Sequence, residues 1–194
     1  TLKQWLKEHP DAPVEEKLSL ADQLLNGVRA LHRADVIHGD LKPDNIMVDT
    51  EGLVRIVDFG SCHCRGMEQH TASIPLGTRH YSAPELVEGE APSEQSDLFS
   101  TAVIIHEMLT GALPWQGRYE KSVHRPLPPL QGHNAFIPLW INNVLQLALQ
   151  RQPKLRFTDA AEFRDALRRP VRSNKPVADS NIRQLRMWKG AVVV

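Results

Sequence analysis

The sequence has little of what marks secreted, membrane-spanning or nucleic-acid-binding proteins. Its two cysteines, Cys62 and Cys64, are separated by one residue and are poorly placed for a structural disulfide. The 23 lysines and arginines equal the 23 aspartates and glutamates, so no strongly basic surface is indicated. The apolar stretch Leu98 to Leu109 is too short to cross a membrane. These absences exclude a disulfide framework, disfavour a nucleic-acid partner and predict a cytoplasmic location.

The composition is that of a folded globular domain. Hydrophobic residues make up 41% and charged residues 24% of the 194 residues, which is enough to bury a core. No signal peptide opens the chain, which begins at Thr1 rather than methionine and enters an amphipathic pattern at once. We therefore expect this sequence to be a segment of a longer protein.

Apolar residues at spacings of three and four predict a mainly helical domain. The stretch Leu98 to Leu109 is apolar almost all round and is followed by Gly111, which is typical of a buried central helix. Thr158 or Asp159 is suited to cap the last helix. The predicted helices run from Leu2 to Leu6, Pro13 to Ala34, Leu98 to Leu109, Leu139 to Leu149 and Ala160 to Leu167.

One β-hairpin is predicted after the first long helix. Ile46 to Val48 and Leu53 to Val57 are β-rich, and Asp49-Thr50-Glu51-Gly52 between them has turn chemistry. Residues 58–93 lack sustained periodicity, and irregular stretches of that length are typical of functional loops.

The polar residues that can carry chemistry stand on either side of this hairpin. Before it runs His38-Gly39-Asp40-Leu41-Lys42-Pro43-Asp44-Asn45, and directly after it stands Asp58-Phe59-Gly60. Phosphoryl transfer needs a carboxylate to accept a proton, a cation facing the phosphoryl group, and oxygen ligands for Mg²⁺. One hairpin brings all of these to one edge.

This set resembles the large carboxy-terminal lobe of a serine/threonine protein kinase from about Thr1 to about Arg168. The resemblance implies a mainly α fold, a protein-kinase-like C-lobe helical bundle with a small β-hairpin at the active-site edge and with the N-lobe absent from this chain. It divides the chain into a partial kinase domain, residues 1–169, and a linker or juxtamembrane-like tail, residues 170–194. The short helical layout is typical of a bacterial source.

The resemblance also implies a role for each polar residue. Asp40 matches the catalytic aspartate, and Lys42 matches the lysine that neutralises charge on the γ-phosphate of ATP. Asn45 and Asp58 match the two Mg²⁺ ligands. ATP and Mg²⁺ are thus the implied cofactors, bound through Lys42, Asn45 and Asp58. Lysine at position 42 favours protein serine or threonine hydroxyls over tyrosine as acceptors.

Further matches lie downstream. The run Gly77-Thr78-Arg79-His80-Tyr81-Ser82-Ala83-Pro84-Glu85 resembles the end of an activation segment, which implies substrate binding by Gly77 and Thr78. Asp97 matches the aspartate that holds the catalytic loop through backbone amides, and Arg156 matches the arginine that pairs with Glu85. Structural support is therefore implied for His38, Glu85, Asp97 and Arg156.

Gly39 replaces the arginine that most kinases carry before the catalytic aspartate. Glycine has no side chain that could bind a phosphate group on the activation segment. We therefore expect activity that does not depend on phosphorylation of that segment, as in a kinase of the non-RD class. His-Gly-Asp also resembles phosphotransferases that modify aminoglycosides or choline, but Ala83-Pro84-Glu85 and Asp97 favour a protein kinase. A pseudokinase or scaffold stays an alternative, against which the complete set of polar residues argues.

Other features of the pattern are absent or weaker. No glycine-rich loop, strand lysine or partner glutamate is found, so the expected partner is an N-lobe in the parent chain, without which this segment should be weakly active or inactive. A metal site at Cys62-His63-Cys64 with His70 is disfavoured, because such residues are common in ordinary loops. The end, Met187 to Val194, resembles the interfacial start of a transmembrane helix, but its five apolar or small residues are too few to decide whether a membrane anchor follows Val194.

Overall fold

The computed structural model describes residues 1–64, 80–117 and 127–168, and its elements are mostly helices. Within these ranges, no helix is both long and apolar enough to span a bilayer. The helices are α1 (Leu2–Glu8), α2 (Val14–Arg33), α3 (Pro84–Val87), α4 (Glu94–Thr110), α6 (Leu139–Ala148) and α7 (Ala160–Leu167). Single 3₁₀ turns are η1 (Pro43–Asn45), η2 (Phe59–Ser61), η3 (Pro114–Gly117), η4 (Leu130–Gly132) and η5 (Pro153–Leu155).

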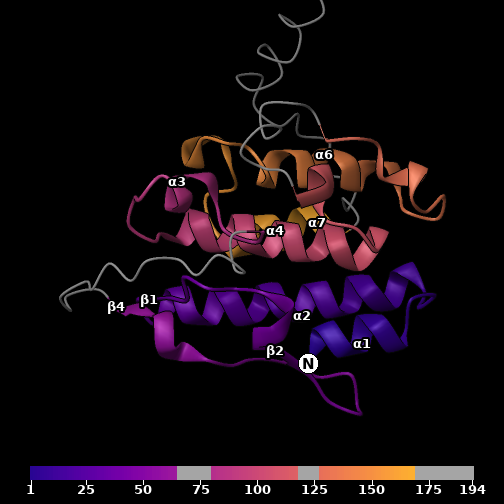
Figure 1. Cartoon of the computed structure of the whole chain (residues 1–194), viewed down its shortest axis with the longest axis horizontal. Helices are drawn as coiled ribbons and strands as arrows, with labels where there is room; N and C mark the ends of the chain where they lie inside the picture. Colours follow the sequence, from indigo (N-terminus) through magenta and orange to yellow (C-terminus); the bar gives the residue numbers. More distant parts are fainter. Residues whose placement is uncertain (65–79, 118–126, 169–194) are drawn as a thin grey trace, which may run out of the picture.

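Helix α4 is the centre of the molecule. It lies between α2 on one side and α6 on the other (Figure 1), and its side chains from Ser96 to His106 are all buried. Ser93 and Ser96 cap its start reciprocally, and Gly111 ends it with a left-handed φ of 71°. The prediction of a buried central helix is confirmed, but the helix starts earlier than predicted because its first turn is polar.

Helix α2 buries the apolar face that its sequence pattern predicts. Leu20, Leu24, Leu25 and Val28 are at most 4% exposed. Glu15 and Glu16 lie in the first turn, where negative charge complements the helix dipole. The predicted helix from Pro13 to Ala34 is confirmed to within one residue at each end.

Helix α7 is fastened to α2 through one shared carboxylate. Asp22 on α2 accepts two hydrogen bonds from Arg164 at 2.8 and 2.9 Å, and two from Arg168 at 2.7 and 3.0 Å. Burial alone would raise the pKa of Asp22, but the hydrogen bonds and charges of the two arginines outweigh it and hold that pKa below its usual value. Asp159 caps α7 by accepting from the backbone N–H of Glu162, as expected.

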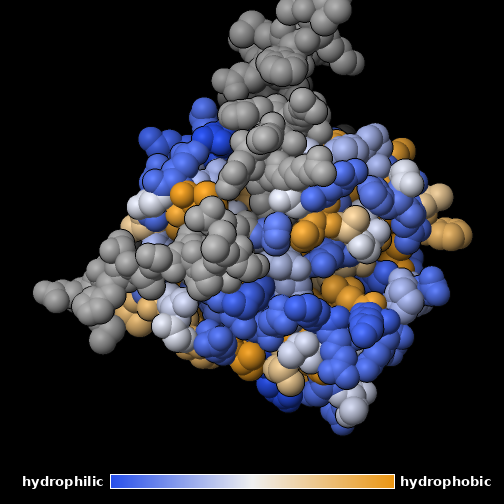
Figure 2. All heavy atoms as spheres, in the orientation of Figure 1, coloured by the Kyte–Doolittle hydropathy of each residue, from blue (hydrophilic) through white to orange (hydrophobic). Residues whose placement is uncertain are grey.

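The predicted hairpin is present as β2 (Ile46–Val48) and β3 (Val54–Ile56), paired antiparallel with Ile46 opposite Ile56. A second pair, β1 (Val36–Ile37) with β4 (His63–Cys64), was not predicted. Strands of two residues are too short to show an alternating pattern, and β4 lies in a stretch read as a loop. The visible surface is mainly hydrophilic, with apolar side chains in small separate groups (Figure 2).

Candidate active site

Three of the predicted site residues lie in direct contact on the loop before β2. The Nζ of Lys42 lies 2.6 Å from Oδ2 of Asp40, and Nδ2 of Asn45 donates to the backbone oxygen of Asp40 at 3.0 Å and to Oδ2 at 3.3 Å. Asn45 is buried on η1, and the Asp40 side chain is only 16% exposed. The loop therefore presents a carboxylate, an ammonium and an amide as one cluster.

The hairpin brings Asp58 to the same end as Asn45. The backbone N–H of Val57, the residue before Asp58, donates to the backbone oxygen of Asn45 at 2.9 Å. Asp58 is exposed and has a left-handed φ of 65°, and its Oδ1 accepts from the N–H of Gly60 at 3.4 Å. A non-glycine residue in this conformation is uncommon, and such residues cluster at functional sites.

Asn45 and Asp58 have the donor chemistry that a magnesium ion requires. Nδ2 of Asn45 donates to Asp40, so the amide oxygen of Asn45 is the atom of this side chain with the chemistry of an ion ligand. Asp58 adds an exposed carboxylate. Mg²⁺ is typically held by one or two such protein oxygens together with phosphate oxygens and water. The residues present therefore fit a magnesium nucleotide.

His38 connects the Asp40 loop with the strand that leads to Asp58. Its imidazole is fully buried, and Nδ1 accepts from the backbone N–H of Asp40 at 3.3 Å. Since Nδ1 accepts, Nε2 carries the proton and donates to the backbone oxygen of Val57 at 3.2 Å. His38 thus lies beneath the loop as a hydrogen-bonding support rather than beside the reacting groups.

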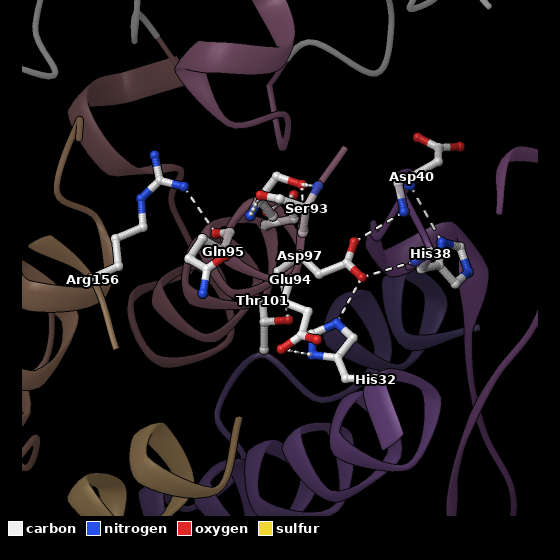
Figure 3. Close-up of polar contacts among 12 residues, drawn as sticks. His32, His38, Asp40, Ser93, Glu94, Gln95, Asp97, Thr101 and Arg156 are labelled. Carbon is white, nitrogen blue, oxygen red and sulfur yellow. Dashed lines mark hydrogen bonds and ion pairs between the residues drawn. The ribbon is translucent and has the colours of Figure 1, made fainter. Parts of the chain in front are cut away.

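Asp97 holds the same loop from α4. Its Oδ2 accepts from the backbone N–H of His38 at 2.8 Å, and its Oδ1 accepts from the backbone N–H of Gly39 at 2.9 Å. Figure 3 shows the carboxylate of Asp97 directed at this loop, whereas the carboxylate of Asp40 points away from it. A buried carboxylate requires such donors, and here they fix the backbone that carries Asp40.

His32 completes the surroundings of Asp97 and was missed by sequence analysis. Its Nε2 lies 3.0 Å from Oδ2 of Asp97, and its Nδ1 lies 3.9 Å from Oε2 of Glu94 (Figure 3). The only sequence signal was a histidine on a helix near the buried apolar positions, which does not reveal a partner on another helix.

Glu85 and Arg156 form a buried bidentate ion pair. The two guanidinium nitrogens donate to the two carboxylate oxygens at 2.6 and 2.7 Å. Arg156 also donates to the backbone oxygen of Gln95 at the start of α4, and its guanidinium lies over the ring of Phe99. All donors of the pair are directed at acceptors, which a buried charge needs. The pair joins α3 to α4 and to the segment before α7.

Several predicted features lie outside the described residues. These are Gly77 and Thr78, His70, and the tail of residues 170–194, including the end that resembles the start of a transmembrane helix. The domain boundary and the cytoplasmic location stay predictions. Among the described residues, no group of three or more His, Cys, Asp or Glu side chains could hold a metal ion. Burial raises the pKa of the Cys62 thiol to about 11, so it is protonated at neutral pH.

Comparison with known proteins relates this chain to a family and to named bacterial relatives. The family model described as the protein kinase domain matches residues 1–170. A probable serine/threonine-protein kinase of Clostridium perfringens is 31% identical over 171 residues, covering 84% of this chain and 25% of the relative. The serine/threonine-protein kinase PrkC of Bacillus subtilis is 27% identical over 170 residues, covering 84% of this chain and 26% of the relative. The serine/threonine-protein kinase PknL of Mycobacterium tuberculosis is 30% identical over 170 residues, covering 82% of this chain and 42% of the relative.

These matches correct the predicted fold class. We expected a C-lobe helical bundle alone, with the N-lobe absent from the chain. The matched family is the protein kinase domain, with residues 1–170 aligned to it and 84% of the chain aligned to the first relative, so the prediction of a C-lobe alone is wrong. The absence of the N-lobe was inferred from motifs that the sequence lacks and from where the chain begins, and neither identifies the part of a domain that a sequence represents. The chain spans about a quarter of the length of the first relatives.

Proposed function

We propose that this chain, which belongs to the protein kinase domain family, transfers the γ-phosphate of ATP to serine or threonine hydroxyls of a protein. Similar bacterial proteins are named serine/threonine-protein kinases, which supports this acceptor class. The observation that carries the proposal is the cluster of Asp40, Lys42 and Asn45, with Asp58 held at the same end of the hairpin.

Asp40 is arranged to accept the proton of the attacking hydroxyl. Its Oδ2 is occupied by Lys42 and Asn45, whereas its Oδ1 is buried and has no hydrogen-bond partner among the described residues. A buried acceptor without a donor is costly. Of the two carboxylate oxygens, Oδ1 is therefore the one left to accept the proton of a substrate hydroxyl in this proposal. The contacts at Oδ2 also fix the direction in which Oδ1 points.

Lys42, Asn45 and Asp58 orient the nucleotide in this proposal. The ammonium of Lys42 provides positive charge beside Asp40, where negative charge collects on the phosphoryl group in transit. The oxygens of Asn45 and Asp58 would hold Mg²⁺, which, when bound, neutralises charge on the phosphates. The loop positions these groups before substrate arrives, and positioning accounts for much of the catalysis in phosphoryl transfer.

The conformation of Gly39 supports activity without phosphorylation of the segment that follows Asp58. Gly39 has a φ of 75° and carries no guanidinium that could bind a phosphate. A Cβ at this position would lie 3.0 Å from the backbone oxygen of Ser61. The loop and the start of the next segment therefore lie close together at Gly39, which supports contact between them without a phosphate bound at this position.

The test is transfer of labelled phosphate from ATP to casein by the protein that contains this chain. Asp40→Asn and Asp58→Ala should each lower the rate by roughly a thousandfold, the usual loss for a general base or a metal ligand. Asp44→Asn is the matched control, because Asp44 lies on the same loop but is paired with Lys3 at the surface.

Three outcomes would remove the proposal. Undiminished transfer by Asp40→Asn and Asp58→Ala would show that these residues are not catalytic. Absence of any transfer by the unaltered protein would favour a scaffold. Phosphate on an aminoglycoside or on choline, with none on protein, would favour a small-molecule phosphotransferase.

A further inference from the structure

One amide side chain on α2 bonds to the backbone on both sides of Leu53, where the turn of the hairpin leads into β3. Nε2 of Gln23 donates to the backbone oxygen of Gly52 at 3.0 Å, and Oε1 of Gln23 accepts from the backbone N–H of Val54 at 3.1 Å. A glutamine supplies one donor and one acceptor at fixed separation, which matches this pair of backbone groups. The contact joins the middle of a long helix to the start of β3.

The next turn of α2 continues the same contact. Gly27 lies four residues after Gln23, which places both on one face of the helix. A Cβ at Gly27 would lie 3.1 Å from Cδ1 of Ile56, so the absence of a side chain lets β3 pack closely against α2. Gln23 therefore fixes the first residue of β3, and Gly27 accommodates the last.

The hairpin depends on this attachment because it is short. Its strands have three residues each, and isolated two-stranded hairpins are marginally stable in water. Inside the hairpin, Asp49 organises the turn by accepting from the N–H groups of Glu51 and Leu53 at 3.0 and 2.9 Å. Asp49 shapes the turn and pairs with Arg55 on β3, whereas Gln23 and Gly27 are residues of α2 that meet β3 directly.

The chain passes from β3 through Val57 to Asp58, and Val57 bonds to the backbone of Asn45. The relative position of the two proposed magnesium ligands therefore follows from where β3 lies. We infer that Gln23 is a positioning residue that, by anchoring β3 to α2, aligns Asn45 and Asp58 for a shared magnesium nucleotide. The inference rests on the proposed function, because it concerns the same ion.

The test compares three variants in the protein that contains this chain. Gln23→Met keeps the side-chain length but removes both hydrogen bonds. Gln23→Glu keeps the acceptor for Val54 and loses the donor to Gly52. Asn26→Ala is the matched control, because Asn26 is an exposed amide on the same helix, three residues further along. Two quantities are measured: hydrogen exchange at the Val54 amide, and the Mg²⁺ concentration that gives half-maximal phosphate transfer at fixed ATP.

In Gln23→Met, exchange at Val54 should accelerate roughly tenfold, the equivalent of one ordinary hydrogen bond. The half-saturating Mg²⁺ concentration should rise roughly tenfold, as when residues that orient metal ligands are removed. Gln23→Glu should accelerate exchange at Val54 less than Gln23→Met does, because it keeps an acceptor but faces the carbonyl oxygen of Gly52, and it should show a smaller rise in the Mg²⁺ requirement. Asn26→Ala should change neither quantity.

An unchanged Mg²⁺ requirement in Gln23→Met overturns the inference, whether or not exchange at Val54 accelerates, because the contact then has a structural role alone. If Gln23→Met does not fold, Gln23→Glu decides, and an unchanged Mg²⁺ requirement in that variant has the same meaning. Failure of the proposed function is recognised separately, by Asp58→Ala transferring phosphate at the unaltered rate. In that case both proposals fall.

Discussion

The backbone N–H of Gly39 donates to Oδ1 of Asp97 at 2.9 Å, so a residue of the central helix holds the backbone next to Asp40. The two carboxylate oxygens of Asp97 accept from the backbone N–H groups of His38 and Gly39. In Asp97→Asn an NH₂ group replaces one of these oxygens, so one of the two N–H groups is left without an acceptor in a buried site. We expect the free energy of unfolding to fall by about 3 kcal/mol. Phosphate transfer should fall by roughly a hundredfold, because Asp40 is no longer held in place.

The two effects of Asp97→Asn are measured by urea denaturation and by labelled phosphate transfer. Asp165→Asn is the control, since Asp165 is an exposed aspartate on α7. Normal transfer by a folded Asp97→Asn protein would show that the loop keeps its shape without this carboxylate.

Glu85 and Arg156 should behave as one unit in a double-mutant cycle. Glu85→Gln or Arg156→Met alone leaves a charge buried without its partner and should cost about 3–5 kcal/mol of unfolding free energy. Combining the two should cost clearly less than the sum, because no charge remains unpaired. Thermal and urea unfolding of the four proteins measure the coupling, and strictly additive losses would contradict it.

His106 should make stability depend on pH in the weakly acidic range. Burial lowers its pKa from the ordinary value of 6.5 to about 4, although the bond from Nδ1 to the backbone oxygen of Ala112 opposes this change. Between pH 4 and pH 6.5, therefore, the His106 side chain is protonated in the unfolded chain and neutral in the folded chain. The stabilisation is complete above pH 6.5 and is lost as the pH falls towards 4, by roughly 3 kcal/mol.

This prediction is checked by measuring unfolding free energy at a series of pH values for the unaltered protein and for His106→Gln. In His106→Gln the free energy of unfolding should not show the decrease that we assign to His106, but it should still show the decrease caused by protonation of carboxylates. Equal slopes for both proteins between pH 6.5 and 4 would show that His106 is not the group responsible.

Gly39→Ala should cost more stability than Gly52→Ala. Both glycines have a left-handed φ, 75° and 76°, so both substitutions incur strain of about 1 kcal/mol. Only at position 39 does a Cβ also meet a neighbour, the backbone oxygen of Ser61 at 3.0 Å, whereas nothing lies within 4 Å at Gly52. The difference in unfolding free energy between the two variants isolates this contact. A difference of zero would show that the Ser61 segment moves aside freely.

Sequence reasoning succeeded where one element carries its own pattern. Apolar positions such as Leu24 and Val28 recur at helical spacing, so α2 was predicted within one residue at each end. The contacts that Asp97 makes with the loop are those expected for it, although its catalytic relevance stays a prediction. His32 and Gln23 were missed, because a polar residue on a helix looks the same in sequence whether it faces water or a partner element.

The shared carboxylate of Asp22 also bears on how the domain forms during synthesis. Asp22 and Arg164 are separated by 142 residues, so a ribosome completes α2 long before the helix that covers it is made. Contacts of such large sequence separation form late, because a long loop must close first. Until α7 emerges, the part of α2 that α7 covers stays exposed, and exposed apolar surface of this kind is where chaperones bind and aggregation begins.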